Sequence, residues 1–328
     1  MTKRAIRHKG RKILILVLAV LFIVAAVVGW SLTHESTDSS LRTIVVGYQP
    51  GSAWDIIKSR GTFAANMKKE GYRITFKQFQ NGPAMLESVA TGDVDYAPVG
   101  DTPPISSLAS GVELTYVAAE NTQAKNSEVL VGKDSGIDSL ADLKGKKVAY
   151  TKGSSSQYMV FQTLKKAGLG VNDITWVNLT QDAAAVAFAN GSVDAWATWA
   201  PMSTKTETSG TAKVLVNGEQ TGADNRHFII PSKQFAKNNQ DVTKLLITYG
   251  EEEMEWINDN HTEVIDSLAK ILKVPKKAVR LMVERQTFSL QKMKESYVDE
   301  EQKIADEFYD EGILAKKVDI SKHVDYLD

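Results

Sequence analysis

Five short loops rich in glycine, serine, threonine and proline recur along the chain, each directly after a predicted strand. They are GYQPGSAW at 47–54, QNGPA at 80–84, VGDTPP at 99–104, TKGSSSQ at 151–157 and ATWAP at 197–201. Glycine lets a ligand approach the backbone, and the unpaired N–H groups in the first turn of a helix favour an anion. These loops are therefore the candidate ligand-binding segments.

The run Gly153-Ser154-Ser155-Ser156 is the strongest anion-binding candidate among them. Its hydroxyls and its run of backbone amides can donate hydrogen bonds to a tetrahedral oxyanion. The same residues can instead do no more than cap the helix that follows. The sequence leaves both interpretations open.

Three tryptophans, Trp54, Trp196 and Trp199, lie in or next to the candidate loops. Their rings could cover the apolar part of a ligand, and packing in the hydrophobic core is the alternative. In the predicted strand VDAWATW, the period of two puts Trp196 and Thr198 on one face and Trp199 on the other.

Metal, nucleotide and covalent chemistry find little support in the sequence. The absence of cysteine excludes disulfides, thiolate metal sites, cysteine nucleophiles and the acylated cysteine of a lipoprotein. The five histidines lie far apart, at His8, His34, His227, His261 and His323. No phosphate-binding loop, dinucleotide-binding fingerprint or nucleophile elbow is present. We expect no metal, no cofactor and no catalytic residue, although spacing alone leaves a serine triad open.

Charge argues against a nucleic-acid partner. The chain has 39 Lys+Arg and 40 Asp+Glu residues, for a net charge of -1. Six of the basic residues precede the first acidic residue: Lys3, Arg4, Arg7, Lys9, Arg11 and Lys12. Without these six, residues 13–328 carry 33 basic and 40 acidic residues. The body of the protein is therefore mildly acidic.

The N-terminus reads as a membrane signal. Residues 13–30, ILILVLAVLFIVAAVVGW, contain no charge. As a helix they would cover about 27 Å of a bilayer core of about 30 Å. The basic residues 1–12 should stay cytoplasmic, which sends the rest of the chain outside, with 31–40 as a polar linker. The length of the run favours an uncleaved anchor, and a cleaved signal peptide is the alternative.

From Leu41 onward, short β-branched runs alternate with helical patterns, which predicts an α/β fold with a parallel sheet. Helix starts are predicted at Ser52, Asn81, Asp101 and Ser154. After about residue 235, long charged helices are predicted to pack outside the sheets. The body exceeds one typical domain, so two lobes are expected.

Several of these motifs resemble the aliphatic-sulfonate substrate-binding proteins of ABC transporters, in the sulfonate/nitrate/taurine-binding family. The resembling segments are GYQPGS at 47–52, NGPAMLESVATGDVDYAPVGDTPPI at 81–105, DLKGKKVAYTKGSSSQ at 142–157 and NGSVDAWATWAP at 190–201. The resemblance extends over essentially the whole body. It implies a type II periplasmic-binding-protein fold, in which two α/β lobes close on a ligand about a hinge. Lobe 1 would comprise 41–127 and 228–328, and lobe 2 would comprise 128–227.

The resemblance also implies which residues meet the ligand. A sulfonate stays ionised at every physiological pH, so its site needs hydrogen-bond donors rather than a titrating base. With the tryptophans of the loops, the expected ligand-binding residues are Gln49, Trp54, Gly82, Pro83, Gly100, Asp101, Thr102, Gly153, Ser154, Ser155, Trp196, Thr198 and Trp199. Two departures from the family pattern are Ala200, where an aspartate is frequent, and the missing lipoprotein cysteine. Arg285 could add a charge to the anion or be an exposed helix-end residue.

The resulting expectation is a monomeric extracytoplasmic binding protein, attached to the outer face of the membrane or periplasmic if the signal is cleaved. It would capture an aliphatic sulfonate and deliver it to an ABC transporter permease. Taurine, nitrate or an aromatic sulfonate are alternative ligands. An exported sensor without transport is an alternative of another class. Enzymes related to the pyrimidine synthases of thiamine biosynthesis share this architecture but use cysteine-rich motifs, which this chain lacks.

Overall fold

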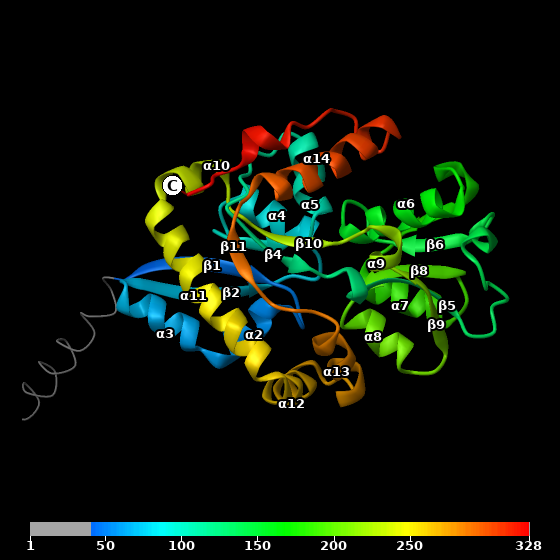
Figure 1. Cartoon of the computed structure of the whole chain (residues 1–328), viewed down its shortest axis with the longest axis horizontal. Coiled ribbons are helices and arrows are strands. Elements are labelled where there is room, and N and C mark those ends of the chain that lie inside the picture. The colour runs from blue at the N-terminus through cyan, green and yellow to red at the C-terminus, as the bar shows by residue number, and fades with distance from the viewer. Residues whose placement is uncertain (1–40, 328) are drawn as a thin grey trace, which may run out of the picture.

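The protein forms two α/β lobes that lie side by side, each built around its own β-sheet (Figure 1). The computed structural model describes residues 41–327. The first lobe contains the beginning and the end of the described chain, and the second lobe consists of its middle part. The chain passes from the first lobe to the second between β4 and β5, and returns before β10.

The strands of the first lobe join into one mixed sheet in the order β2-β1-β3-β10-β4-β11. β1 pairs in parallel with β2, and a parallel bridge between Val46 and Tyr96 links β1 to the segment of β3. β10 is antiparallel to both β3 and β4, and β11 is antiparallel to β4. Their bounds are β1 (Arg42–Tyr48), β2 (Tyr72–Gln78), β3 (Ala97–Val99), β4 (Ala118–Thr122), β10 (Arg226–Ile230) and β11 (Leu290–Lys292).

The sheet of the second lobe has the order β7-β6-β8-β5-β9. β6 is parallel to β7 and β8, whereas β5 is antiparallel to β8 and β9. The prediction of a parallel sheet was therefore wrong in part, because β5 and β10 each follow a passage between lobes and run against their neighbours. The bounds are β5 (Ser127–Gly132), β6 (Lys147–Tyr150), β7 (Thr175–Asn178), β8 (Ala195–Trp199) and β9 (Ala212–Asn217).

Helices cover both faces of each sheet (Figure 1). In the first lobe these are α2 (Ala53–Arg60), α3 (Thr62–Lys69), α4 (Gly82–Ala90), α5 (Thr102–Ala109), α10 (Lys233–Asn238), α11 (Gln240–Asp259), α12 (His261–Leu272), α13 (Lys276–Glu284) and α14 (Glu295–Asp310). In the second lobe they are α6 (Ser155–Ala167), α7 (Gln181–Ala189), α8 (Met202–Glu207) and α9 (Gly218–Thr221). Short 3₁₀ turns are η1 (Ala124–Asn126), η2 (Leu140–Leu143), η3 (Val171–Asp173) and η4 (Ile320–His323). The prediction that the late charged helices pack outside the sheets is confirmed.

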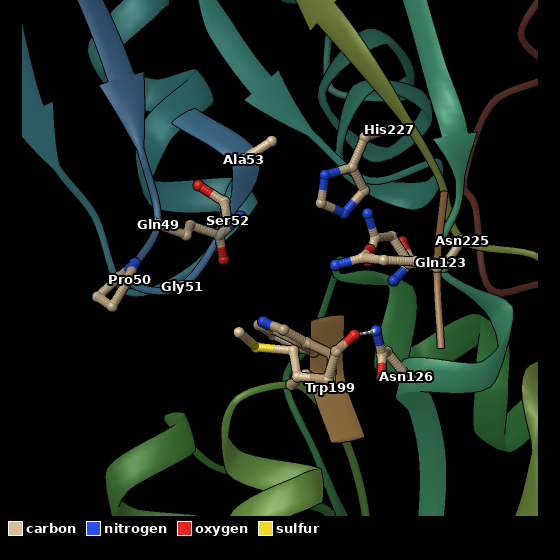
Figure 2. A pocket seen from close by; sticks show the side chains of 13 residues that line it. Gln49, Pro50, Gly51, Ser52, Ala53, Gln123, Asn126, Trp199, Asn225 and His227 are labelled. Atoms are coloured by element: carbon tan, nitrogen blue, oxygen red, sulfur yellow. Dashed lines mark hydrogen bonds between the residues drawn. The ribbon is translucent and has the colours of Figure 1, made fainter. Parts of the chain in front are cut away.

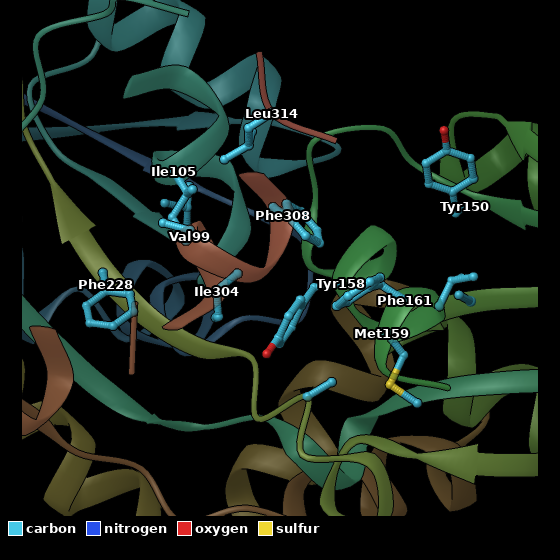
Figure 3. Close-up of a cluster of buried hydrophobic side chains, with 14 of the residues drawn as sticks. Val99, Ile105, Tyr150, Tyr158, Met159, Phe161, Phe228, Ile304, Phe308 and Leu314 are labelled. Atoms are coloured by element: carbon cyan, nitrogen blue, oxygen red, sulfur yellow. The ribbon is translucent and has the colours of Figure 1, made fainter. Parts of the chain in front are cut away.

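One hydrophobic cluster continues from lobe to lobe (Figure 3). Tyr158 and Phe161 of α6 pack against Phe308 of α14, with ring centroids 5.6 and 5.7 Å from Phe308. Glu307, beside Phe308, accepts hydrogen bonds from the Tyr158 hydroxyl at 3.0 Å and from Gln162 at 2.5 Å. Helices α6 and α14 therefore hold the outer edges of the two lobes together.

The predicted helix starts are realised in different ways. Asn81 accepts a hydrogen bond from the Ala84 amide and Ser154 from the Ser156 amide, as expected for N-caps. Ser52 also stands at a helix start, but its side chain makes no capping hydrogen bond. The Asp55 carboxylate accepts from the Gly51 amide at 3.0 Å instead, so the helix start predicted at Ser52 is present but lacks the reciprocal side-chain capping that the Ser52–Asp55 spacing would allow.

The predicted membrane helix at 13–30, with its flanking segments 1–12 and 31–40, lies outside the described residues. Within residues 41–327, no helix combines the length and the apolar character that a bilayer crossing requires.

Candidate functional site

The loops at the carboxyl ends of the strands meet between the two lobes and enclose two adjoining cavities. We call the first the glycine–serine pocket, which has a volume of about 20 Å³. Its lining combines first-lobe backbone at Gly82 and Gly100 with Ser154 and Ser155 at the start of α6. The remaining residues around it are Gln49, Pro103, Trp199, Asn225 and His227.

The second cavity, of about 30 Å³, shares Gln49, Trp199, Asn225 and His227 with the first. We call it the amide pocket because side-chain amides dominate its polar lining. Figure 2 shows Gln49 and Ser52 on one side, and Gln123, Asn225 and, above them, His227 on the other. The other residues around this pocket are Pro50, Gly51, Ala53, Asn126, Ala200, Met282 and Gln286.

Neither pocket is lined by an aspartate, glutamate, lysine or arginine. The single titratable side chain in both linings is His227, whose side chain is 15% exposed. Burial lowers the pKa of His227 to about 4, so the imidazole is neutral at neutral pH. The cleft therefore presents neutral hydrogen-bonding groups.

Buried polar atoms without partners concentrate around the amide pocket. Of the 11 such side-chain atoms in the described residues, five belong to its lining: Gln49 Oε1, Ser52 Oγ, Asn126 Oδ1, Asn225 Oδ1 and Gln286 Oε1. The Asn126 amide is oriented by its Nδ2, which donates to the Met282 carbonyl at 2.9 Å. An unpaired buried polar atom costs about 1–3 kcal/mol. This cluster therefore favours an occupant that can donate hydrogen bonds.

The hydroxyls at the start of α6 are engaged within the protein. Ser154 Oγ donates to the Thr151 carbonyl at 2.8 Å and lies 2.9 Å from Ser156 Oγ. Ser156 Oγ accepts from the Thr151 amide at 3.0 Å. The Ser155 hydroxyl bonds to Asp101 of the first lobe. The capping interpretation thus holds for Ser154 and Ser156. The Ser154 N–H donates to the Thr151 carbonyl at 3.3 Å, so the Ser155 N–H is the backbone amide of this helix start that remains for a ligand.

The lobes touch at Gly100. A Cβ added there would lie 2.3 Å from Ser155 Oγ and 2.3 Å from Asn225 Oδ1, so only glycine fits. Its neighbour Asp101 is fully buried and does not line either pocket. Burial raises the pKa of Asp101, while hydrogen bonds from Ser155, Thr102 and the Asn225 amide oppose that rise.

The structure brings Gln49, Gly82, Gly100, Ser154, Ser155 and Trp199 of the expected site together at the cleft. The others lie behind it. Thr102 is buried and donates to Asp101, and Thr198 donates to Gln181 at 2.6 Å. Trp196 packs beside Phe188 in the core of the second lobe. Gly153 packs near Pro83, with the added Cβ 3.7 Å from the proline ring, so these two residues form contact between the lobes.

Trp54 is fully buried in the core of the first lobe. Its indole Nε1 donates to Glu120 Oε1 at 2.8 Å, and its ring meets Phe63 edge-on at 5.6 Å. Burial raises the pKa of Glu120 to about 7, partly offset by this indole hydrogen bond. Trp54 thus lines neither pocket, and its indole contacts Glu120 in the core instead.

Sequence reasoning missed Ser52, Gln123, Asn126, Asn225, His227, Met282 and Gln286. Gln123, Asn126 and Asn225 lie in the two segments that connect the lobes, and His227 is the second residue of β10, the strand after the second segment. The expected chain crossings could have pointed to them, because a connecting segment runs along the floor of a cleft. Met282 and Gln286 come from α13 and the turn after it, and no local signal marks them.

Arg285 has neither of the roles foreseen for it. Its guanidinium bonds Glu128 Oε1 at 2.6 Å and lies 2.9 Å from Glu207 Oε2. Both carboxylates belong to the second lobe, so Arg285 ties the lobes together beside the connecting segments. Among residues 41–327, no group of three or more His, Cys, Asp or Glu side chains is placed to hold a metal ion.

Two α/β lobes joined by two short segments, with a small polar cleft between the carboxyl ends of their strands, define the class of two-lobed α/β ligand-binding proteins. Residues 66–260 match the model of the family described as NMT1/THI5 like. The chain belongs to the NMT1/THI5-like family.

Known relatives agree with the resemblance expected from the motifs. A protein of Escherichia coli (strain K12), whose name assigns it to aliphatic sulfonates, is 33% identical over 90% of this chain and 91% of its own. A Bacillus subtilis (strain 168) protein of the same name is 32% identical over 96% of this chain and 95% of its own. The taurine-binding periplasmic protein of Escherichia coli (strain K12) is 27% identical over 75% and 78%.

Solved structures agree as well. The alkanesulfonate-binding protein SsuA from Xanthomonas axonopodis pv. citri, solved with MOPS bound, has a TM-score of 0.82 and 30% identity, covering 86% of this chain and 97% of its own. The periplasmic aliphatic sulphonate binding protein SsuA from Escherichia coli has a TM-score of 0.78 and 31% identity, covering 87% and 97%. The expected periplasmic-binding-protein fold is confirmed, and these relatives are binding proteins rather than enzymes.

Proposed function

We propose that this protein is an extracytoplasmic solute-binding protein that captures an aliphatic sulfonate and delivers it to the permease of an ABC transporter. The observation that carries the proposal is the cleft itself: both lobes line it, and every side chain in its lining is uncharged at neutral pH. A permanently ionised headgroup needs donors rather than a base. The choice of a sulfonate as the ligand comes from the names of the relatives, which are sulfonate-binding proteins.

In this proposal the glycine–serine pocket holds the sulfonate oxygens. The backbone at Gly82 and Gly100 lets the anion approach closely, and the start of α6 offers the Ser155 amide as a donor and the positive end of a helix dipole. Gln49 donates from the first lobe. Trp199, on the cleft side of β8, covers the carbon chain.

Ligand entry requires the lobes to separate. The pockets, at about 20 and 30 Å³, have room for little more than one or two waters each, since a water needs roughly 10–15 Å³ by this measure. We propose that 41–127 with 228–328 and 128–227 move as two bodies about the connecting segments. Only contacts that are stronger in the closed form shift this equilibrium, so both lobes must touch the ligand.

A second candidate ligand is taurine or another sulfonate with a polar tail. The unpaired oxygens around the amide pocket favour it, because an amino or hydroxyl group at the end of the tail could donate to Asn126 or Gln286. A plain alkyl tail would leave these acceptors unpaired. The choice between the two classes depends on which tail the amide pocket prefers.

The remaining parts of the proposal concern the whole protein. We propose that it acts as a monomer on the outer face of the membrane, with residues 13–30 as its anchor or cleavable signal. No cofactor takes part, and the permease is its macromolecular partner. A sensor without transport would use the same cleft.

The test is thermal unfolding of the purified protein with alkanesulfonates of two to eight carbons, taurine, nitrate and sulfate. A ligand that binds only the folded protein raises its stability by mass action, by about 2.7 kcal/mol at 100 times Kd. We expect one sulfonate to raise the melting temperature more than nitrate or sulfate. Unchanged melting with every sulfonate would contradict the proposed function.

A further inference from the structure

His227 occupies a special place in the cleft. It belongs to β10, and it lines both the glycine–serine pocket and the amide pocket. Neither ring nitrogen forms a hydrogen bond with another residue of the part of the chain that the structure describes. Figure 2 shows the ring above Asn225, across the pocket from Gln49 and Ser52. An anion bound in the cleft would therefore meet an imidazole whose nitrogens are available.

Glu120 lies directly behind this imidazole. Its Oε2 is 3.9 Å from His227 Nδ1, and its Oε1 accepts the indole hydrogen bond of Trp54 at 2.8 Å. Glu120 is 5% exposed, and Trp54 is fully buried. The carboxyl group is thus held with one oxygen on the indole and the other toward the imidazole. β4 and β10 are paired neighbours, which fixes this arrangement in the sheet.

The other charged groups on the elements around His227 are engaged elsewhere. Asp55 of α2 accepts from the Gly51 amide, Asp101 before α5 bonds Thr102 and Ser155, Arg226 of β10 pairs with Glu300, and Arg285 after α13 pairs with Glu128 and Glu207. Glu120 is therefore the titratable group that faces His227. No lysine or arginine lines the cleft to balance a bound anion.

We propose that Glu120 and His227 form a proton-holding pair that places a positive charge against the bound anion. When the sulfonate binds, the Glu120 O–H bond breaks and its proton moves to His227 Nδ1. The imidazolium then donates its Nε2–H to a sulfonate oxygen, and the Glu120 carboxylate stabilises the imidazolium from behind. The net charge of the pair does not change. This inference rests on the proposed function, and His227 is its ligand-binding residue and Glu120 its positioning residue.

The two pKa values agree with this order of events. Burial raises the pKa of Glu120 to about 7 and lowers that of His227 to about 4. Near pH 6 the free protein therefore holds one proton in the pair, on the carboxyl group. A nearby negative charge favours the charged imidazole, so a bound anion reverses the preference. Above pH 7 the carboxyl group has lost its proton, and binding must take one from water.

The expected pH dependence follows from this. Near pH 6, sulfonate binding should exchange almost no protons with water. Near pH 8.5, binding should take up roughly one proton, and Kd should rise by up to about tenfold per pH unit. A neutral ligand of the same shape should show no such dependence, because it does not favour the charged imidazole.

The experiment is calorimetric titration of the purified protein with butanesulfonate near pH 6 and pH 8.5. Each pH uses two buffers of different ionisation enthalpy, neither of them a sulfonate, so that the heat difference counts the protons. Butanesulfonamide serves as the neutral ligand. The number of protons taken up on binding is measured on the wild-type protein alone, so this test does not depend on whether a variant folds.

Variants then assign the effect to residues. His227→Gln keeps a donor but loses the charge, so it should weaken butanesulfonate binding at least about tenfold near pH 6 and abolish proton uptake near pH 8.5. Glu120→Gln still accepts from Trp54 but holds no transferable proton, so proton uptake should now appear near pH 6 as well. The matched controls are His323→Gln and Glu301→Gln, both outside the cleft.

The possible outcomes separate the two proposals. If butanesulfonate binds without proton uptake near pH 8.5, or if His227→Gln binds it as the wild-type protein does, the proton-holding pair is contradicted while the proposed function stands. If butanesulfonate and every other sulfonate fail to bind, the proposed function and this inference fall together.

Discussion

The two lobes have the same strand order but give the cleft different walls. The order β2-β1-β3-β10-β4 in the first lobe corresponds to β7-β6-β8-β5-β9 in the second, with β10 and β5 as the antiparallel strands. After β1 the first lobe presents Gln49 and Ser52, whose polar atoms are unpaired. After β6 the second lobe presents Ser154, whose hydroxyl is already bonded. Two lobes of the same architecture thus differ at the cleft: the polar atoms of Gln49 and Ser52 in the first lobe are unpaired, whereas the Ser154 hydroxyl in the second lobe is held by a hydrogen bond.

This difference suggests how the two lobes share the work. The first lobe supplies Gln49 and Ser52, whose unpaired Oε1 and Oγ atoms can adjust to a ligand, whereas the amides of Asn126 and Asn225 are held by hydrogen bonds to the Met282 carbonyl and to Ser127. The second lobe supplies a helix start and the ring of Trp199, whose geometry is set before the ligand arrives. Preorganised groups lose less entropy on binding, and adaptable groups accept different tails. We infer that the second lobe positions the sulfonate headgroup and that the first lobe selects among ligands with different tails.

The largest effect should come from comparing Trp196 with Trp199 within β8. Trp196→Ala should destabilise the protein by about 3–5 kcal/mol, because it empties a buried core position. Trp199→Ala should cost much less stability but weaken butanesulfonate binding about tenfold, because it removes an apolar wall of the cleft. Chemical denaturation and calorimetry measure the two quantities. Equal losses of stability would contradict the assignment of Trp199 to the cleft.

The contact between the walls can be broken at Gly100. Gly100→Val should weaken sulfonate binding about 100-fold, equivalent to about 2.7 kcal/mol, because its side chain would meet Ser155 and Asn225 and hold the lobes apart. Gly132→Val is the control, since a Cβ there comes no closer than 3.6 Å to Ser135. Small-angle scattering with ligand should show a larger radius for Gly100→Val. Normal closure of this variant would refute the proposed contact.

Stability against pH tests the pair in the first lobe. Folding raises the pKa of Glu120 from 4.5 to about 7, so Glu120 holds an extra proton in the folded protein and its contribution to the free energy of unfolding falls as pH rises from 4.5 to about 7. Folding lowers the pKa of His227 from 6.5 to about 4, so the folded protein lacks a proton there and the contribution of His227 falls as pH drops from 6.5 to about 4. Each group changes the free energy of unfolding by about 1.4 kcal/mol per pH unit at most, and the two changes have opposite signs.

Single variants should therefore separate the opposing slopes. Other buried carboxyl groups, such as Glu128, also contribute to the pH dependence, so each variant is compared with the wild-type protein. His227→Gln removes the His227 slope, so its unfolding free energy should rise relative to that of the wild type as pH drops from 6.5 to about 4. Glu120→Gln removes the Glu120 slope, so its unfolding free energy should rise relative to that of the wild type as pH rises from 4.5 to about 7. Urea denaturation across this range measures both differences, and two differences that change with pH in the same direction would be inconsistent with the assigned protonation.

The smallest effect should come from the outer edge, where α14 meets α6. Glu307 accepts hydrogen bonds from Tyr158, Gln162 and Lys165, the last at 2.9 Å. If these contacts exist only in the closed form, Glu307→Ala should weaken sulfonate binding about fivefold, equivalent to about 1 kcal/mol. Asp310→Ala, at an exposed position on the same helix, is the control. Unchanged affinity would indicate that α14 and α6 stay together in both forms.

Local patterns in the sequence carried much of this information. The glycine- and serine-rich loops after predicted strands located Gly82, Gly100 and Ser155, because ligand sites in α/β sheets form at those ends. The alternation of β8 separated Trp199 from Trp196 correctly, because neighbouring side chains of a strand point to opposite faces.

The rest depended on long-range folding that no local pattern encodes. Asn126 and His227 reach the cleft because the chain passes between the lobes beside them, and Gln286 reaches it because α13 packs against the second lobe. Trp54 looked available in the sequence, yet the packing of α2 turns it into the core. Whether a hydroxyl is free, as in Ser52, or used as a cap, as in Ser154, depends on these contacts.

The measurement that tests the account most directly is a crystal structure of the protein with butanesulfonate. We expect the sulfonate between the lobes, with its oxygens at hydrogen-bond distance from the backbone near Gly100 and Ser155 and from His227, and its chain against Trp199. A sulfonate bound elsewhere, such as in the groove of about 270 Å³ between α6 and α14, or a cleft contacted by one lobe only, would contradict the account.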